Sequence, residues 1–167
     1  MLETTDAVDG MRERLATLYP ELDTSAFGVT GRVLRLAQAI DRHRTEHLNQ
    51  FGLVPGDFDV LATIRRIEGD AGVNPSRLLE SVLITSGGLT KRLDRLQAAG
   101  WVARHPDPDD RRGTLVRLTQ EGRDLVDRAL PSLLSSENEL IERTLSDRQR
   151  DQAAASLRRL VLALPDD

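Results

Sequence analysis

The stretch that decides the fold runs from Ile84 to Thr119 and reads ITSGGLTKRLDRLQAAGWVARHPDPDDRRGTLVRLT. In its first half, three leucines at 89, 93 and 96 recur at helical spacing and give one face of a helix an apolar character. After Gly100 the apolar period changes toward two, which is typical of strands. The segment HPDPDDRRG holds two prolines and a glycine, so it predicts a loop tip between two strands, 101–104 and 114–118.

A second short helix is predicted just before this stretch. Asn74 and Pro75 are a favoured helix start, because asparagine caps the first turn and proline sets φ. Thr85 and Ser86 cap the next helix a few residues later, and two helices this close form a helix-turn-helix. A recognition helix followed by a basic-tipped hairpin fits a major groove and the neighbouring minor groove. The sequence therefore predicts a winged helix-turn-helix that binds double-stranded DNA.

The chain around this centre is predicted to be helical. Apolar stripes mark helices over 26–51, from Pro55 to Ile67, from Thr119 to about Leu145 with a kink at Pro131, and after a capping box at 146–149. The fold class is therefore mainly α with a small β-hairpin. We expect one continuous domain with three parts, which are an extra N-terminal helix (1–25), a DNA-binding region (53–119), and a helical dimerisation region (26–52 and 120–167). The terminal helices carry more apolar surface than one small domain requires, which favours a homodimer.

Composition and charge narrow the function further. The 167 residues include no cysteine, which excludes disulfides and thiolate metal sites. Neither a secretory signal nor a membrane span is predicted, so we expect a cytoplasmic protein. The net charge is −4, yet residues 85–119 hold seven basic and four acidic side chains. A local basic patch on an acidic body suits a site-selective DNA binder, although ordinary solvated charge would give the same count.

Nothing in the sequence indicates an enzyme or a cofactor. Phosphate-binding glycine loops, nucleophile elbows and metal-ligand clusters are all missing from the sequence. His43 and His47 lie four apart and could grip a metal at two points. They fall on an apolar stripe without a third ligand nearby, which favours a buried or interface pair. The alternative to a DNA binder is a winged-helix module for protein interaction or dimerisation, which would not need the basic tip.

Three short motifs carry a resemblance to a known family. GWVAR (100–104), DRRG (110–113) and LVRLT (115–119) with Gly122 resemble the wing of MarR-family transcriptional regulators. GDFDVLATIRR (56–66) and SGGLTKRLDRLQAAGWV (86–102) resemble its PecS-like branch, which includes urate-responsive repressors. The resemblance covers residues 27–163. It implies a homodimeric repressor that leaves a pseudo-palindromic operator when a small anionic or aromatic effector binds.

The resemblance also implies which residues contact DNA. At the hairpin tip, Arg112 is expected to enter the minor groove, Asp110 to orient it, and Arg111 to contact phosphate. An exposed ion pair at the tip is the structural alternative. On the recognition helix, hydroxyls, a glycine and cations are expected to face phosphates and base edges; they are Ser86, Gly87, Thr90, Lys91 and Arg95.

Three further charged residues match the effector network of the urate-responsive branch. We hypothesise that Asp59, Arg92 and Arg104 couple a small anion to the position of the recognition helix. A purely structural ion pair between the winged region and the core explains the same residues equally well. Leu15 stands where that branch carries a ligand-contacting tryptophan, which argues against urate itself.

Overall fold

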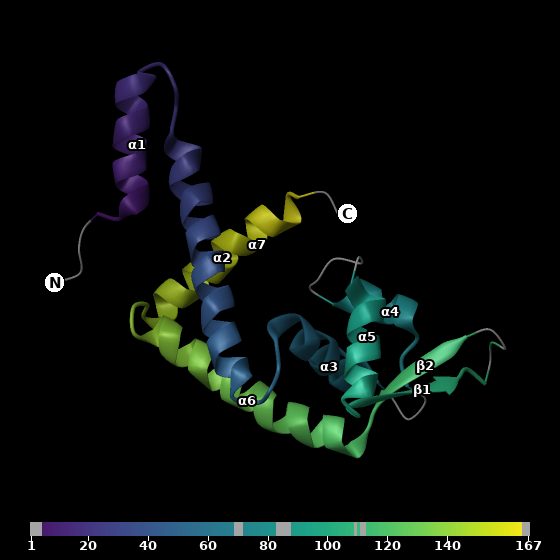
Figure 1. The fold of residues 1–167 in the computed structure, drawn as a ribbon. Coiled ribbons are helices and arrows are strands. Elements are labelled where there is room, and N and C mark those ends of the chain that lie inside the picture. The colour runs from purple at the N-terminus through teal and green to yellow at the C-terminus, as the bar shows by residue number, and fades with distance from the viewer. Residues whose placement is uncertain (1–4, 69–71, 83–87, 109, 111–112, 165–167) are drawn as a thin grey trace. The chain divides into compact units, whose positions relative to one another are not determined.

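A computed structural model describes residues 5–68, 72–82, 88–108, 110 and 113–164 of the chain. The described residues form seven helices and one antiparallel hairpin (Figure 1), so the mainly α class with a small β-hairpin is confirmed. The chain divides into two compact units, Met1–Glu46 and His47–Asp167. The three-part division predicted from the sequence stays a prediction.

The first unit consists of α1 (Ala7–Leu18) and most of α2 (Ser25–Asn49). Asp6 caps α1 by accepting the N–H of Val8 at 2.8 Å. Arg32 of α2 binds the carboxylates of both Asp6 (2.9 Å) and Asp9 (2.8 Å), which fastens α1 to α2. The short helix predicted before Pro20 is therefore present, and it packs on its neighbour as a short helix must.

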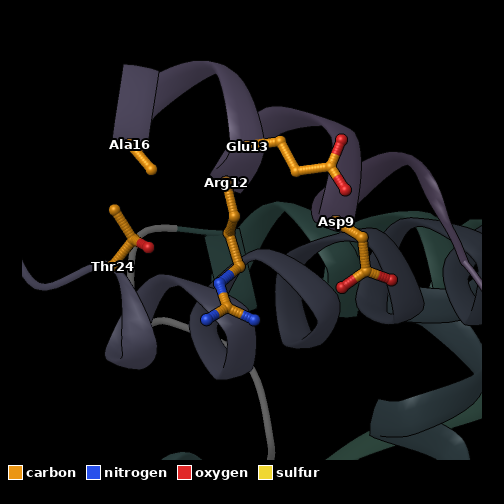
Figure 2. Close-up of a pocket in the computed structure, with 5 residues that line it drawn as sticks. All are labelled: Asp9, Arg12, Glu13, Ala16 and Thr24. Carbon is orange, nitrogen blue, oxygen red and sulfur yellow. The ribbon is translucent and has the colours of Figure 1, made fainter. Parts of the chain in front are cut away.

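An open pocket of about 280 Å³ lies in the first unit between α1 and the start of α2 (Figure 2). Arg12 and Asp9 point from α1 toward α2. Gly28 leaves room for Arg12, because a Cβ at that position would lie 3.3 Å from its Nη1 atom. The lining combines two carboxylates with one guanidinium, and it consists of Asp9, Arg12, Glu13, Ala16 and Thr24.

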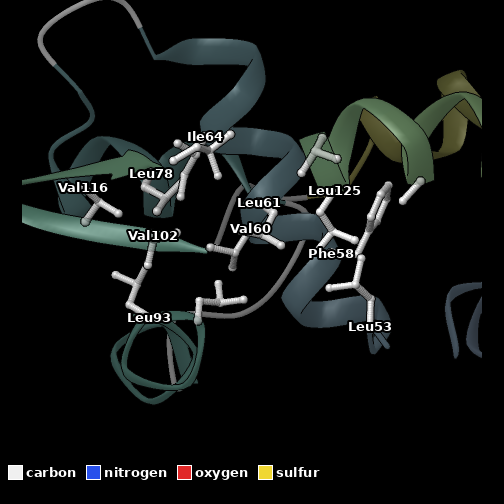
Figure 3. Packing of buried hydrophobic residues seen from close by; sticks show 14 of the residues in the cluster. Leu53, Phe58, Val60, Leu61, Ile64, Leu78, Leu93, Val102, Val116 and Leu125 are labelled. Atoms are coloured by element: carbon white, nitrogen blue, oxygen red, sulfur yellow. The ribbon is translucent and has the colours of Figure 1, made fainter. Parts of the chain in front are cut away.

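The second unit is built around α3 (Pro55–Ile67). Its apolar face packs into a single core with the helices and strands that follow it (Figure 3). Phe58, Leu61 and Ile64 are buried there, as the sequence pattern predicts. The other elements are α4 (Pro75–Ser81), α5 (Leu89–Ala98), β1 (Val102–Pro106), β2 (Thr114–Leu118), α6 (Gln120–Glu142) and α7 (Asp147–Leu162).

One strand and two helices end at residues other than those predicted. The first strand continues past Arg104, since His105 pairs with Leu115 and Pro106 with Thr114. A proline is tolerated at a strand end, where its missing N–H leaves no ladder bond unmade. Helix α2 ends at Asn49 instead of residue 51, and α6 ends at Glu142 instead of Leu145 after continuing past Pro131.

The end of α2 has a clear local cause. Gly52 adopts a φ of 69°, and its N–H donates to the carbonyl of Asn49 at 3.0 Å. The next N–H, from Leu53, reaches back to the carbonyl of Leu48 at 3.1 Å. This pair of bonds is a Schellman motif, which satisfies the last helical carbonyls and turns the chain.

A backbone pairing that the sequence did not indicate lies beside the hairpin. The N–H of Val73 donates to the carbonyl of Val116 at 2.9 Å, and the N–H of Val116 donates back at 2.8 Å. Strand β2 is therefore bonded along one edge to β1 and at one point on its other edge to Val73.

Helix α7 leaves its apolar side chains open to solvent. It begins with the predicted capping contact, in which the N–H of Ser146 donates to Oε1 of Gln149 at 2.9 Å. None of the residues of α7 is buried, and its exposed apolar side chains include Leu157, Leu160, Val161 and Leu162. Among the described residues, no helix combines the length and the apolar character needed to cross a membrane.

Candidate nucleic-acid interface

Helix α5 is held by a buried leucine face. Leu89, Leu93 and Leu96 are buried in the core, and α5 contacts α3 and β1 through this side. The opposite side presents the exposed residues Thr90 and Lys91. The packing therefore fixes which side of the helix faces outward, as the spacing of the leucines predicts. Ser86 and Gly87, together with the predicted cap at Thr85, lie outside the described residues.

The root of the hairpin is fixed by Thr119, the residue that caps α6. Its hydroxyl donates to the carbonyl of Gly100 at 2.7 Å and accepts the N–H of Gly122 at 3.0 Å. Its own N–H donates to the carbonyl of Trp101 at 3.0 Å. Gly122 permits this approach, because a Cβ there would lie 2.0 Å from the Trp101 carbonyl oxygen. The start of β1 and the start of α6 are thus locked together.

A buried carboxylate fixes the same root from the other side. Glu68, at the end of α3, is 2% exposed and forms an ion pair with Arg123 of α6. It also accepts the backbone N–H of Leu118, the last residue of β2, at 3.1 Å. One side chain therefore links α3, β2 and α6. Glu68 is the residue after the helix predicted to end at Ile67, and nothing in the neighbouring sequence indicates this role.

At the hairpin tip, two backbone hydrogen bonds join described residues. The N–H of Asp107 donates to the carbonyl of Gly113 at 3.1 Å, and the N–H of Gly113 donates to the carbonyl of Asp110 at 2.8 Å. A Cβ on Gly113 would lie 2.8 Å from that of Asp107, so this position requires glycine. Asp110 is exposed at this tip. Arg111 and Arg112 lie outside the described residues, so the orientation of Arg112 by Asp110 stays a prediction.

Arg95, one of the predicted DNA contacts, is engaged with the protein itself. Its Nη2 lies 2.5 Å from Oδ1 of Asp57, and its Nε donates to Oδ2 at 3.2 Å. This two-bond pairing with Asp57 raises the pKa of Arg95. The Asp57 carboxylate is 11% exposed, whereas the Arg95 side chain is 57% exposed. Sequence reasoning missed Asp57, although an acid in the first turn of a helix is a recognisable stabilising feature.

Arg92 lies against the same carboxylate. Its Nε is 3.8 Å from Oδ1 of Asp57. Two glycines leave space for its guanidinium, because a Cβ on Gly56 would lie 2.6 Å from Nη2 and one on Gly88 would lie 3.1 Å from Nη1. Arg92 therefore leans inward from α5, toward the first turn of α3.

The three residues predicted to couple an effector have the following contacts. Arg92 pairs with Asp57, and Arg104 of β1 pairs with Asp94 of α5 at 2.7 Å. Asp59 is half-buried on α3. The two arginines thus pair with acids that the sequence hypothesis did not include, and both of these acids face α5 or belong to it.

His47 makes a polar contact within the second unit. Its Nε2 lies 2.9 Å from the hydroxyl oxygen of Ser132 on α6, and its ring packs 6.0 Å from that of Phe51. In the part of the chain that the structure describes, no three histidine, cysteine or acidic side chains gather as a metal site would require.

Comparison with known proteins identifies the family. The model of the MarR family matches residues 51–113. The HTH-type transcriptional regulator PecS of Dickeya dadantii is 32% identical over 159 residues, which cover 95% of this chain and 93% of PecS. This chain belongs to the MarR family of DNA-binding transcriptional regulators. The prediction of a regulator instead of an enzyme is confirmed by these relatives.

Solved structures of the MarR family match the fold. A mutant MarR from E. coli in complex with operator DNA is 28% identical, with a TM-score of 0.70 over 90% of this chain and 98% of that one. Sco3205 from Streptomyces coelicolor, also in complex with DNA, has a TM-score of 0.77 at 21% identity, over 87% of this chain and 91% of that one. At 21% identity, the similarity to Sco3205 is evidence for the fold alone. Both agree with the winged helix-turn-helix predicted from the sequence.

Proposed function

We propose that this MarR-family protein is a homodimeric repressor that binds a pseudo-palindromic operator, with α5 in the major groove and the hairpin in the adjacent minor groove. The observation that carries the proposal is the outward face of α5, where Thr90 and Lys91 are exposed while three buried leucines fix the helix orientation. Hydroxyls and ammonium groups suit base edges and phosphates. The hairpin root is fastened to the same core, so helix and hairpin are presented together.

The hairpin tip supplies the proposed minor-groove contact. Arg112 is the residue we assign to the groove, with Asp110 orienting it and Arg111 on the phosphates. A guanidinium is favoured in a narrow minor groove because the electrostatic potential there is strongly negative. Ser86 and Gly87 complete the proposed contact set at the start of the recognition helix, beside Thr90 and Lys91. Arg95, the remaining residue of the predicted set, is bonded to Asp57 and is left out of the proposed contacts.

A dimer would cover the apolar surface of α7. Leu157, Leu160 and Val161 are exposed on this helix, and contiguous apolar surface of this kind marks interaction sites in other proteins. In the first unit, Val29, Val33 and Leu36 of α2 are likewise exposed. A two-fold axis also matches a pseudo-palindromic operator, because each half-site then meets the same recognition helix.

We assign the regulator to the PecS-like branch and propose a small anionic or aromatic effector. The similarity to PecS supports the branch. Asp59, Arg92 and Arg104 are the proposed coupling residues, and an anion would act by replacing a carboxylate partner of one of the arginines. Calorimetric titration with urate and with aromatic acids tests this role. Equal binding by the wild type and Arg104→Ala would contradict it, and Leu15 in place of tryptophan leads us to expect an effector other than urate.

A gel shift with the DNA upstream of the protein's own gene, over a salt series, tests DNA binding. We expect Lys91→Ala to weaken binding and to lower the slope of log K against log salt by about one, because one phosphate contact is lost. Arg112→Ala is expected to weaken binding as well. Arg148→Ala, at the start of α7, removes the same charge and is the control. Unchanged binding by both Lys91→Ala and Arg112→Ala would contradict the proposed contact surface.

A further inference from the structure

We infer that Asp57 is a positioning residue that withholds Arg95 from the DNA backbone and so limits sequence-independent binding. This inference rests on the proposed function. The outward side of α5 carries Lys91 and Arg95, two cations that a phosphate backbone would attract. Only one of them, Arg95, is bonded through two of its nitrogens to a carboxylate of the protein itself.

The position of Asp57 makes it a lasting partner for Arg95. It lies in the first turn of α3, where the helix dipole favours a negative charge. Its side chain is 11% exposed and lies on the element that forms the centre of the core. Both of its oxygens accept bonds from Arg95, so the pair has the two-bond geometry in which an arginine and a carboxylate bind most strongly.

Arg92 reinforces the arrangement from the inner side of α5. Its Nε lies 3.8 Å from Oδ1 of Asp57, and its guanidinium occupies the space left by Gly56 and Gly88. One carboxylate therefore faces two cations of the recognition helix. Because Arg92 also attracts the carboxylate, Asp57 is held in place while Arg95 remains 57% exposed at the surface.

The consequence for DNA binding follows from the origin of non-specific affinity. Each cation that neutralises a phosphate releases counterions, and this term contributes equally to every DNA sequence. A cation already neutralised by Asp57 contributes little to it. Contacts to base edges are unaffected, so the carboxylate lowers the affinity for random DNA and for the operator by a similar factor. Asp57 thereby reduces the sequence-independent part of the affinity.

Salt titration of binding to a random-sequence duplex and to the upstream duplex tests the inference. Asp57→Asn keeps the size of the side chain and removes its charge. We expect this variant to bind both duplexes more tightly than the wild type, with a slope of log K against log salt steeper by about 0.9 and with its preference for the upstream duplex unchanged. Asp57→Asn combined with Arg95→Gln should return the slope to its wild-type value, and Asp57→Glu should keep it.

Asp127→Asn is the matched control, because Asp127 binds Nε and Nη2 of Arg65 in the same two-bond manner at the opposite end of α3. It should leave the slope unchanged. Equal slopes for Asp57→Asn and the wild type would overturn the inference, as would weaker binding to both duplexes or loss of the folded state in thermal unfolding. A wild-type protein without preference for the upstream duplex would overturn the proposed function, while the slopes on random DNA would still test Asp57.

Discussion

Glu68 and Arg123 form an ion pair in which the carboxylate is almost completely enclosed and the guanidinium is partly exposed, at 2% and 35%. The same carboxylate accepts the N–H of Leu118, so it joins the end of β2 to α3 and α6. Burying a charge without its partner is costly, whereas the complete pair is tolerated. The pair is therefore a point at which the fold of the hairpin root is sensitive to a single substitution.

We expect Arg123→Ala to lower the free energy of unfolding by about 2 kcal/mol, somewhat less than for a fully buried pair because water reaches Arg123. Urea denaturation followed by circular dichroism measures this change. Arg65→Ala is the control, since it breaks the exposed pair with Asp127, and it should have a much smaller effect. Equal losses of unfolding free energy for the two variants would show that the burial of the Glu68 carboxylate does not make the removal of its partner more costly.

Gly122→Ala is expected to destabilise the protein through a backbone clash. The added Cβ would lie 2.0 Å from the carbonyl oxygen of Trp101, and neither group can move without breaking the contacts of Thr119. We expect a loss of about 3 kcal/mol in urea denaturation, near the upper end for overpacking. Gly10→Ala in α1 meets open space and should instead favour its helix by up to about 1 kcal/mol. A neutral Gly122→Ala would mean that the close approach is not maintained in solution.

The pair between Arg65 and Asp127 gives stability a defined dependence on pH. The hydrogen bond from Arg65 lowers the pKa of Asp127 in the folded protein. A carboxyl group whose folded pKa is lowered stabilises the fold above its unfolded pKa of about 3.9, and this contribution is lost as the pH falls through the folded value. NMR titration of Asp127 should show protonation below pH 3.9, and Arg65→Gln should shift that titration upward. If Asp127 titrated at the same pH in the wild type and in Arg65→Gln, the ion pair with Arg65 would not be the cause of a pH-dependent stability.

Substitution on the apolar side of α7 tests the proposed dimer. Leu157→Glu places a charge among Leu160 and Val161, so it should shift the protein toward monomers in analytical ultracentrifugation. Gln152→Glu adds the same charge to a polar position of the same helix and should leave the association state unchanged. A Leu157→Glu protein that dimerises as strongly as the wild type would remove α7 from the proposed interface.

The sequence predicts the helices and strands well because their evidence is local. Apolar periods locate α3 and α5, and Asn74, Thr119 and Ser146 act as the caps that their types and positions indicate. The exact end of β1 is harder to predict from the sequence. Pro106 is a residue type that favours turns, and it joins the strand only because Thr114 lies opposite it in the folded protein.

The partners of the charged residues could not be predicted in the same way. Arg95 and Asp57 are 38 residues apart, and whether Asp57 or Asp59 faces α5 depends on how α3 is rotated in the core. The bonds between Val73 and Val116, and between Glu68 and Leu118, likewise join segments that are distant in sequence. Residue type indicates that such groups need partners, but only the packed fold selects them.

Strand β2 is bonded on one edge to β1 and on the other to Val73, and its last residue is held by Glu68. The direction in which the hairpin leaves the core is therefore set when the chain folds. Binding to the hairpin therefore does not have to offset a loss of conformational entropy at its root, because the root is already ordered. This is the general advantage of a preorganised binding element. Differences in affinity between ligands of the hairpin should consequently arise at its tip, and the base of the wing should behave as a fixed support.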